Sequence, residues 1–164
     1  LASSAASDVY KRQFCDRTLE AYGKHFTFGD VVRASRLALD EGVYYAHFLI
    51  LGGYGDTREN VRETIENSRR MEYTVMFPYA GMRIYPHTRL AELAAKEGAI
   101  GRDDDLMAPS YYISRDFDLE EVRRAALATG KAWVFPDDPQ SALADTLRLK
   151  RNKKGPLWEY LRKP

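Results

Sequence analysis

The sequence predicts an α/β fold, because three helical patterns alternate with two strand patterns between residues 27 and 98. The first helix is indicated by Thr27 and Asp30, whose three-residue spacing has the form of a capping box. Apolar residues then recur at helical spacing from Val31 until Gly42, which ends the pattern. The order helix, strand, helix, strand, helix is typical of this fold class.

The first predicted strand covers residues 43–51, a run rich in β-branched and aromatic side chains. Because the run has almost no polar residue, we expect a strand that is buried on both faces, and such strands are usually parallel. A turn over residues 52–56 follows it. Thr57 then begins a helix that places Val61 and Ile65 on one face.

The second predicted strand lies in residues 74–77 and 81–85. We expect these two segments to form one strand with a bulge around Pro78 to Gly81, since proline cannot donate to a central ladder of hydrogen bonds. Thr88 caps the next helix, and Gly98 ends it.

The remaining residues predict a helical C-terminal extension over residues 115–164. Helices are indicated from Asp118 to about Gly130 and over residues 138–150. An acidic loop and a short extended segment precede them. Residues 1–13 show no periodicity, and we expect them to be a non-native or disordered leader outside the fold.

The composition of the chain excludes several classes of function. The chain has 164 residues, 45% of them hydrophobic and 30% charged, with a net charge of +1 and one cysteine. A nucleic-acid partner would call for a larger basic excess, and a single cysteine excludes a disulfide within the chain and a four-thiolate metal site. No apolar run approaches the roughly 20 residues that span a bilayer. We therefore expect a cytoplasmic protein without a membrane span or a nucleic-acid partner.

The spacing of catalytic residue types excludes several enzyme classes. The three histidines and Cys15 form no zinc-binding or thiol-redox motif, and the chain has no G-x-S-x-G sequence. The glycine-rich turn after the first strand is the best candidate site, because ligands of parallel α/β folds bind at that edge. We expect Gly52 and Gly53 to keep the turn open for a ligand.

Two segments resemble a known family. Residues 47–57, HFLILGGYGDT, and residues 81–88, GMRIYPHT, resemble the fifth and sixth strand regions of radical S-adenosylmethionine enzymes, which commonly carry G-x-P-G-E-T and Y-P-G-T. Residues 97–100, 111–114 and 155–161 further resemble the subgroup with an N-terminal cobalamin-binding domain, some of it associated with lipid biosynthesis. Tyr54, Asp56 and His87 depart from these patterns.

The resemblance implies that residues 14–114 form the C-terminal part of a partial (β/α) TIM-type barrel. It implies that Ile50 packs on the adenine of S-adenosylmethionine, with Gly52 and Gly53 beside it. Main-chain groups of Tyr85 and Pro86 would also meet the adenine. Arg83 would lie on the same strand as these two residues, with a side chain able to reach a carboxylate or phosphate.

The implied cofactors are S-adenosylmethionine, a four-iron four-sulfur cluster and, for this subgroup, cobalamin. The family's CxxxCxxC cluster loop is absent, so the resemblance implies a C-terminal fragment that is inactive without its N-terminal half. The whole enzyme would use an external electron donor and generate a deoxyadenosyl radical that acts on a lipid-like substrate. The resemblance names no catalytic residue in this chain.

Two other functions remain open at this point. One is an α/β binding module without catalysis. The other is a fragment of an aldolase-type barrel that binds phosphate, although neither predicted strand carries the lysine that such a site would use.

Overall fold

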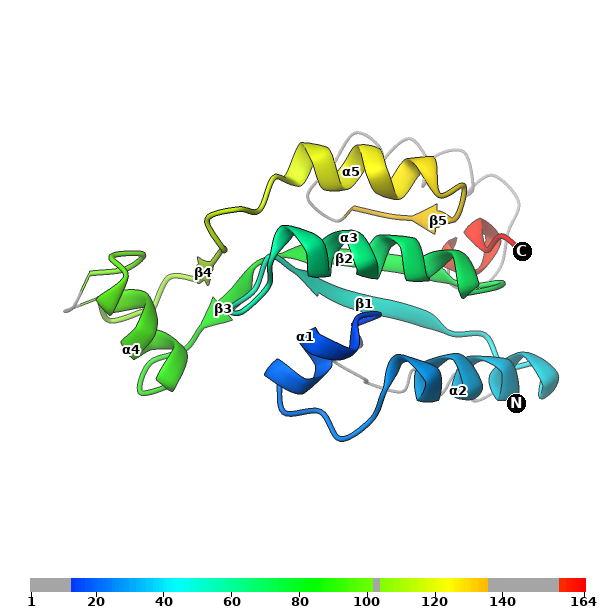
Figure 1. Ribbon diagram of the computed structural model, residues 1–164, viewed down its shortest axis with the longest axis horizontal. Coiled ribbons are helices and arrows are strands. Elements are labelled where there is room, and N and C mark those ends of the chain that lie inside the picture. Colours follow the sequence, from blue (N-terminus) through cyan, green and yellow to red (C-terminus); the bar gives the residue numbers. More distant parts are fainter. Residues whose placement is uncertain (1–12, 102–103, 136–156) are drawn as a thin grey trace.

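The protein is a mixed α/β structure, as the sequence predicts. The computed structural model describes residues 13–101, 104–135 and 157–164. Its main sheet has three parallel strands in the order β1-β2-β5 (Figure 1), and their bounds are Ala46–Leu51, Val75–Ala80 and Ala132–Trp133. The predicted parallel pairing of the first two strands is confirmed. The strands described here form an open sheet and not a closed barrel.

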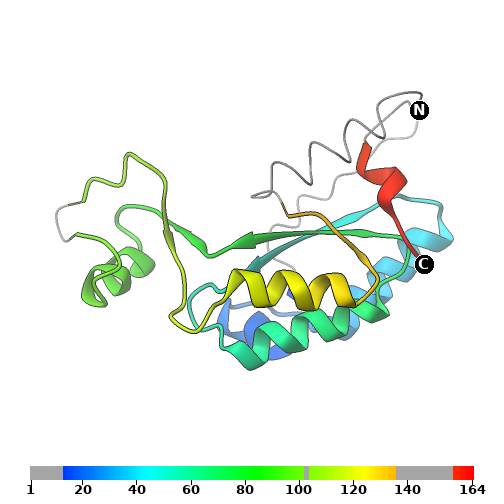
Figure 2. The ribbon, with the colours of Figure 1, turned by 90° about the horizontal axis from the view of Figure 1, so that it is seen from above.

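The α-helices of this part lie on one side of the sheet, and the short 3-10 turn near the C-terminus lies on the other (Figure 2). Thr27 and Asp30 form the predicted capping box at α2, and Thr57 caps α3 as predicted. The first helix, α1, was not predicted, because it is short and has no side-chain cap. The helices of this part are α1 (Asp16–Ala21), α2 (Phe28–Asp40), α3 (Arg58–Asn67) and α5 (Leu119–Ala128), with the 3-10 turns η1 (Ser68–Arg70) and η2 (Leu157–Leu161).

One core joins these helices to the sheet. Leu49 and Leu51 of β1 are 0% and 1% exposed, and they pack with Met76 of β2 and Trp133 of β5. Alternation along a strand places side chains two residues apart on the same face. The core therefore lies on the face that carries Leu49 and Leu51. The helices contribute Phe28, Val31, Val32, Val61, Ile65, Val122 and Ala126 to it.

No described α-helix covers the opposite face of the sheet, where only η2 lies, near the start of β2. Phe48 on β1 and Tyr79 on β2 are each 43% exposed, and Ile50 is half-buried. The expectation that the first strand is buried on both faces is therefore wrong. An apolar, aromatic run does not by itself show how many faces of a strand are covered. Here the α-helices cover only one face of the sheet.

The expectation of one bulged strand around Pro78 is also wrong, because β2 runs through this residue. The carbonyl of Met76 accepts a hydrogen bond from Val134, on the β5 side. Pro78 lies two residues after Met76, so its backbone nitrogen points to the same side of the strand as the Met76 carbonyl. On that side β5 has already ended, so the N–H that proline lacks would have had no partner there. The strand stops at Gly81, whose φ is +74°.

A second, smaller sheet follows Gly81. Strand β3 (Met82–Ile84) pairs antiparallel with β4 (Ser110–Tyr112), and helix α4 (Arg89–Lys96) packs on one face of this ribbon. Its own core contains Ile84, Ala94, Leu106 and Tyr112. Residues 81–85 therefore leave the parallel sheet (Figure 1) instead of continuing the barrel strand that the resemblance implies.

The C-terminal region is not purely helical. Helix α5 is confirmed, but Ala132 and Trp133 form the third parallel strand of the main sheet. A boundary at residue 114 would therefore divide this sheet. The predicted helix over residues 138–150 lies outside the described residues. Within the described ranges, no helix is both long enough and apolar enough to span a membrane.

The predicted leader is described only at its last residue. Gln13 is 0% exposed, and its side-chain amide donates a hydrogen bond to the carbonyl of Ile50. Gln13 therefore belongs to the fold, and residues 1–12 lie outside the described part of the chain.

Candidate functional site

The carboxyl edge of the main sheet is the candidate site. Strands β1 and β2 end together there, with Leu51 paired to Ala80. The Gly81 N–H donates to the Leu51 carbonyl at 2.8 Å, and the Ser114 N–H donates to the Gly52 carbonyl at 2.8 Å. Three segments that are far apart in the sequence therefore meet at the edge where parallel α/β folds bind ligands.

A buried carboxylate closes the glycine turn at this edge. Asp56 is 8% exposed and accepts hydrogen bonds from the N–H groups of Gly52 at 3.0 Å and Gly53 at 3.3 Å. The Thr18 hydroxyl donates to its other oxygen at 3.0 Å. Burial raises the pKa of Asp56, and the hydrogen bond from Thr18 opposes this shift. Burial also raises the pKa of the nearby Tyr22 hydroxyl.

Side chains of the protein itself fill the space beside Gly52 and Gly53. The turn is therefore not open to a ligand, contrary to our expectation. Gly52 has a φ of +73°, and a Cβ on it would lie 2.9 Å from the Phe117 Cβ and closer still to the ring. A Cβ on Gly53 would overlap the Tyr22 hydroxyl. Since the N–H groups of both glycines are also engaged by Asp56, this turn does not offer the free backbone donors of a phosphate cradle.

The stability that Asp56 contributes should depend on pH with a defined sign. Its raised pKa means that the folded protein binds more protons than the unfolded chain between the two pKa values, so stability falls as pH rises through this window. Asp56→Asn removes this titration and keeps an acceptor for the glycine N–H groups. We expect the free energy of unfolding of the parent, relative to Asp56→Asn, to decrease as pH rises above about 4. Urea unfolding at several pH values measures this difference, and an increase over the same window would contradict it.

The structure brings together three of the six predicted site residues. Ile50 is half-buried at the end of β1, and its Cγ2 lies 3.4 Å from the position of a Cβ on Gly53. Gly52 follows the last residue of β1 and has a φ of +73°, and a Cβ on it would meet Phe117. It therefore does not continue the face on which Ile50 lies.

The other three predicted site residues lie on the ribbon. Arg83 is on β3, and Tyr85 and Pro86 follow it, so these three residues do not lie at the carboxyl edge of the parallel sheet as the resemblance implies. The neighbours of the glycine turn are instead Gly81 and Ser114.

Sequence reasoning missed the side chains that shape the turn. Asp56 was noted only as a departure from the family pattern, although an aspartate three residues after a glycine can accept from the backbone of its own turn. No local signal identifies Thr18, Tyr22 or Phe117, because each reaches the turn from a distant part of the chain.

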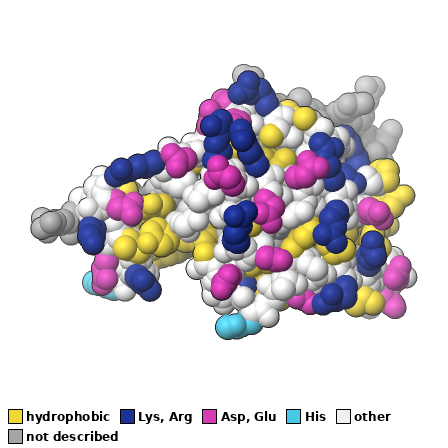
Figure 3. All heavy atoms as spheres, viewed as in Figure 1, with side chains coloured by type: hydrophobic (Ala, Val, Ile, Leu, Met, Phe, Trp, Pro, Cys, Tyr) yellow, Lys and Arg dark blue, Asp and Glu magenta, His cyan; other side chains and the backbone are white. Residues whose placement is uncertain are grey.

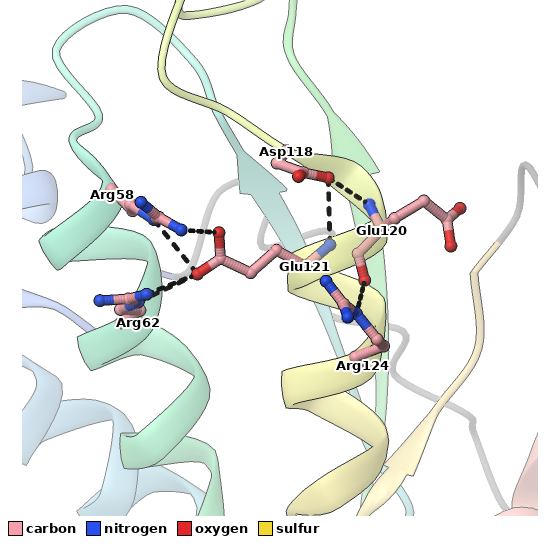
Figure 4. A network of polar contacts seen from close by, with 6 residues as sticks. All are labelled: Arg58, Arg62, Asp118, Glu120, Glu121 and Arg124. Carbon is pink, nitrogen blue, oxygen red and sulfur yellow. Dashed lines mark hydrogen bonds and ion pairs between the residues drawn. The ribbon is translucent and has the colours of Figure 1, made fainter.

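A charged network joins α3 to α5 beside this edge (Figure 4). The Glu121 carboxylate accepts from Arg62 at 2.6 Å and from Arg58, and Asp118 caps α5. Hydrogen bonds from Arg58 and then Arg62 lower the pKa of Glu121. Acidic and basic side chains are interspersed over this helical side of the molecule (Figure 3). The two arginines are engaged by Glu121, so we assign the network to helix pairing.

A metal site would need several ligand side chains close together. No group of three histidine, cysteine, aspartate or glutamate side chains that could hold a metal ion occurs among the described residues. Cys15 is buried and free. The described residues therefore do not fit an iron–sulfur cluster.

Comparisons with known proteins leave the family of this chain open. A scan against family models, a search of curated proteins and a search of solved structures each found no match.

Proposed function

We propose that this chain is the C-terminal part of a radical S-adenosylmethionine enzyme and contributes the adenine-facing edge of its binding site. One observation carries the proposal. The parallel sheet has helices on one face, and on the other an apolar face that no α-helix of residues 13–101 and 104–135 covers, with Ile50 on that face at the carboxyl edge. A strand with this arrangement suits the inner wall of a (β/α) barrel.

The residues at the edge would bind the adenosyl group by packing and exclusion of water. Ile50 would lie against the adenine, and Tyr79 is its partner across the β1–β2 pair. Gly52 and Gly53 would border the ring, whereas Tyr85 and Pro86 lie on the ribbon and have no part in the proposed adenine site. S-adenosylmethionine supplies radical hydrogen abstraction from a substrate in the proposed reaction.

Other parts of the proposal lie outside the described residues. The iron–sulfur cluster would be held by another part of the protein. The proposal also includes an apolar, lipid-like substrate, an external electron donor and, for this subgroup, cobalamin.

A binding module without catalysis is the second candidate. It is favoured by the closed glycine turn, in which Asp56, Tyr22 and Phe117 occupy the space beside Gly52 and Gly53. The phosphate-binding alternative is disfavoured by the same contacts, because the N–H groups it would use already have an acceptor.

Replacing Ile50 with aspartate tests the adenine assignment. We expect Ile50→Asp to weaken binding of S-adenosylmethionine to this chain at least about tenfold, because a carboxylate buried against an adenine loses hydration without gaining a partner. Calorimetric titration on folded protein measures the affinity.

Val43→Asp is the control for this test. Val43 precedes β1, is 40% exposed and lies at the other end of the sheet, so its replacement should leave affinity unchanged. Leu51→Asp is unsuitable, since Leu51 is 1% exposed in the core. A parent chain that binds no S-adenosylmethionine, or an Ile50→Asp chain that binds it as tightly, would contradict the proposal.

A further inference from the structure

The uncovered face of the sheet continues onto the ribbon. Gly81, with a φ of +74°, joins β2 to β3, and the side chain of Ile113 borders it. Arg83 is exposed on β3. Helix α4 lies on the same side of the strands as α3 and α5 (Figure 2), so no described helix covers the opposite face of the ribbon. The uncovered faces of the two sheets therefore adjoin at Gly81.

Aromatic side chains line the part of this face that belongs to the main sheet. The ring of Phe48 stacks on Phe77, with centroids 5.2 Å apart, and on Tyr79 at 6.3 Å. Such a surface is wide, rigid and apolar. It suits the non-polar part of a ligand.

The ribbon part of the face combines aromatic side chains with one arginine. Arg83 lies directly opposite Tyr111 in the antiparallel pair, and its guanidinium carbon is 4.9 Å from the centre of the Tyr85 ring. Tyr85, Tyr111 and Ile113 are 53%, 54% and 49% exposed. The side chain of Ile113 borders Gly81, since a Cβ there would lie 2.7 Å from its Cγ1.

Arg83 differs from the arginines of the helical side. In the described part of the chain it has no hydrogen bond or ion pair, whereas Arg58 and Arg62 share Glu121. A guanidinium stacked on a ring keeps its N–H edge available for a carboxylate or phosphate. Stacking on Tyr85 also limits the entropy lost when this edge binds an anion.

We propose that this face binds an elongated apolar molecule that carries a single anionic group. The anion pairs with Arg83, and the apolar part lies over Gly81 and Ile113 toward Tyr79 and Phe48. Four residues separate Arg83 from Tyr79, a span of at most about 14 Å of extended chain, so a medium-length alkyl chain reaches the aromatic rings. The inference rests on the proposed function for its reaction and names the substrate class of that site.

Decyl phosphate tests this assignment in calorimetric titrations of the chain below its micelle-forming concentration. Decanol and inorganic phosphate each supply half of the ligand, and decanoate separates carboxylate from phosphate recognition. Arg83→Gln should weaken decyl phosphate binding about tenfold or more, the usual contribution of a charge-assisted hydrogen bond, and leave decanol binding unchanged. Tyr79→Ala should weaken both.

Arg124→Gln is the matched control, because Arg124 is an exposed arginine of α5 on the helical side. It should bind decyl phosphate as the parent does. Three results would overturn the inference: an Arg83→Gln chain with parental affinity, inorganic phosphate binding as tightly as decyl phosphate, or self-association of the chain that Tyr79→Ala abolishes while decyl phosphate does not bind. A chain that fails the Ile50 test and passes this one would retain the amphipathic site and lose the adenosyl assignment.

Discussion

Gly52→Ala should destabilise the protein by about 2 to 5 kcal/mol, the sum of a left-handed backbone strain and an overpacked contact. Gly52 has a φ of +73°, which an L-residue adopts at a cost. The added methyl group would also collide with Phe117, which packs against the main core. Urea unfolding monitored by circular dichroism measures the loss.

Gly42→Ala separates the two causes. Gly42 has a similar φ of +67°, but nothing lies within 4 Å of a Cβ placed on it, so only the backbone strain applies. Combining Gly52→Ala with Phe117→Ala should give a smaller loss than the sum of the two single changes. Equal losses for Gly52→Ala and Gly42→Ala would show that Phe117 does not enforce the glycine.

Leu49→Ala should cost about 2 to 5 kcal/mol in the free energy of unfolding, the range for a fully buried leucine. Leu49 is 0% exposed and lies at the centre of the core between the sheet and its helices. The truncation leaves a cavity that the surrounding helices cannot fill. The midpoint of urea unfolding reports this change.

The adjacent Phe48→Ala is the control for Leu49→Ala, because Phe48 points to the uncovered face and is 43% exposed. It removes more atoms, yet it should cost less than Leu49→Ala. The opposite ranking in this chain would mean that another element covers the aromatic face. In a longer protein that closes the barrel over this face, the cost of Phe48→Ala should increase.

The sequence by itself determined helices α2 to α5 and the parallel pair β1 and β2. The capping box at Thr27, the cap at Thr57 and the cap at Thr88 depend on contacts within three residues, and all three form. The parallel pairing of β1 with β2 follows from a helix lying between two apolar strands. The placement of Ile50 on the face opposite Leu49 and Leu51 follows from strand alternation alone.

Only the tertiary structure decided which surfaces these elements cover. Phe117 and Tyr22 reach the glycine turn from distant positions, and Ala132–Trp133 joins the sheet beside β2, so no local spacing predicts them. At Gly81 the chain leaves the parallel sheet because Met82–Ile84 gains a partner in Ser110–Tyr112, about 28 residues further on. Pairing between strands this far apart in the sequence depends on how the whole chain packs. A local sequence pattern shows that a residue is apolar, but it does not show which residue packs against it.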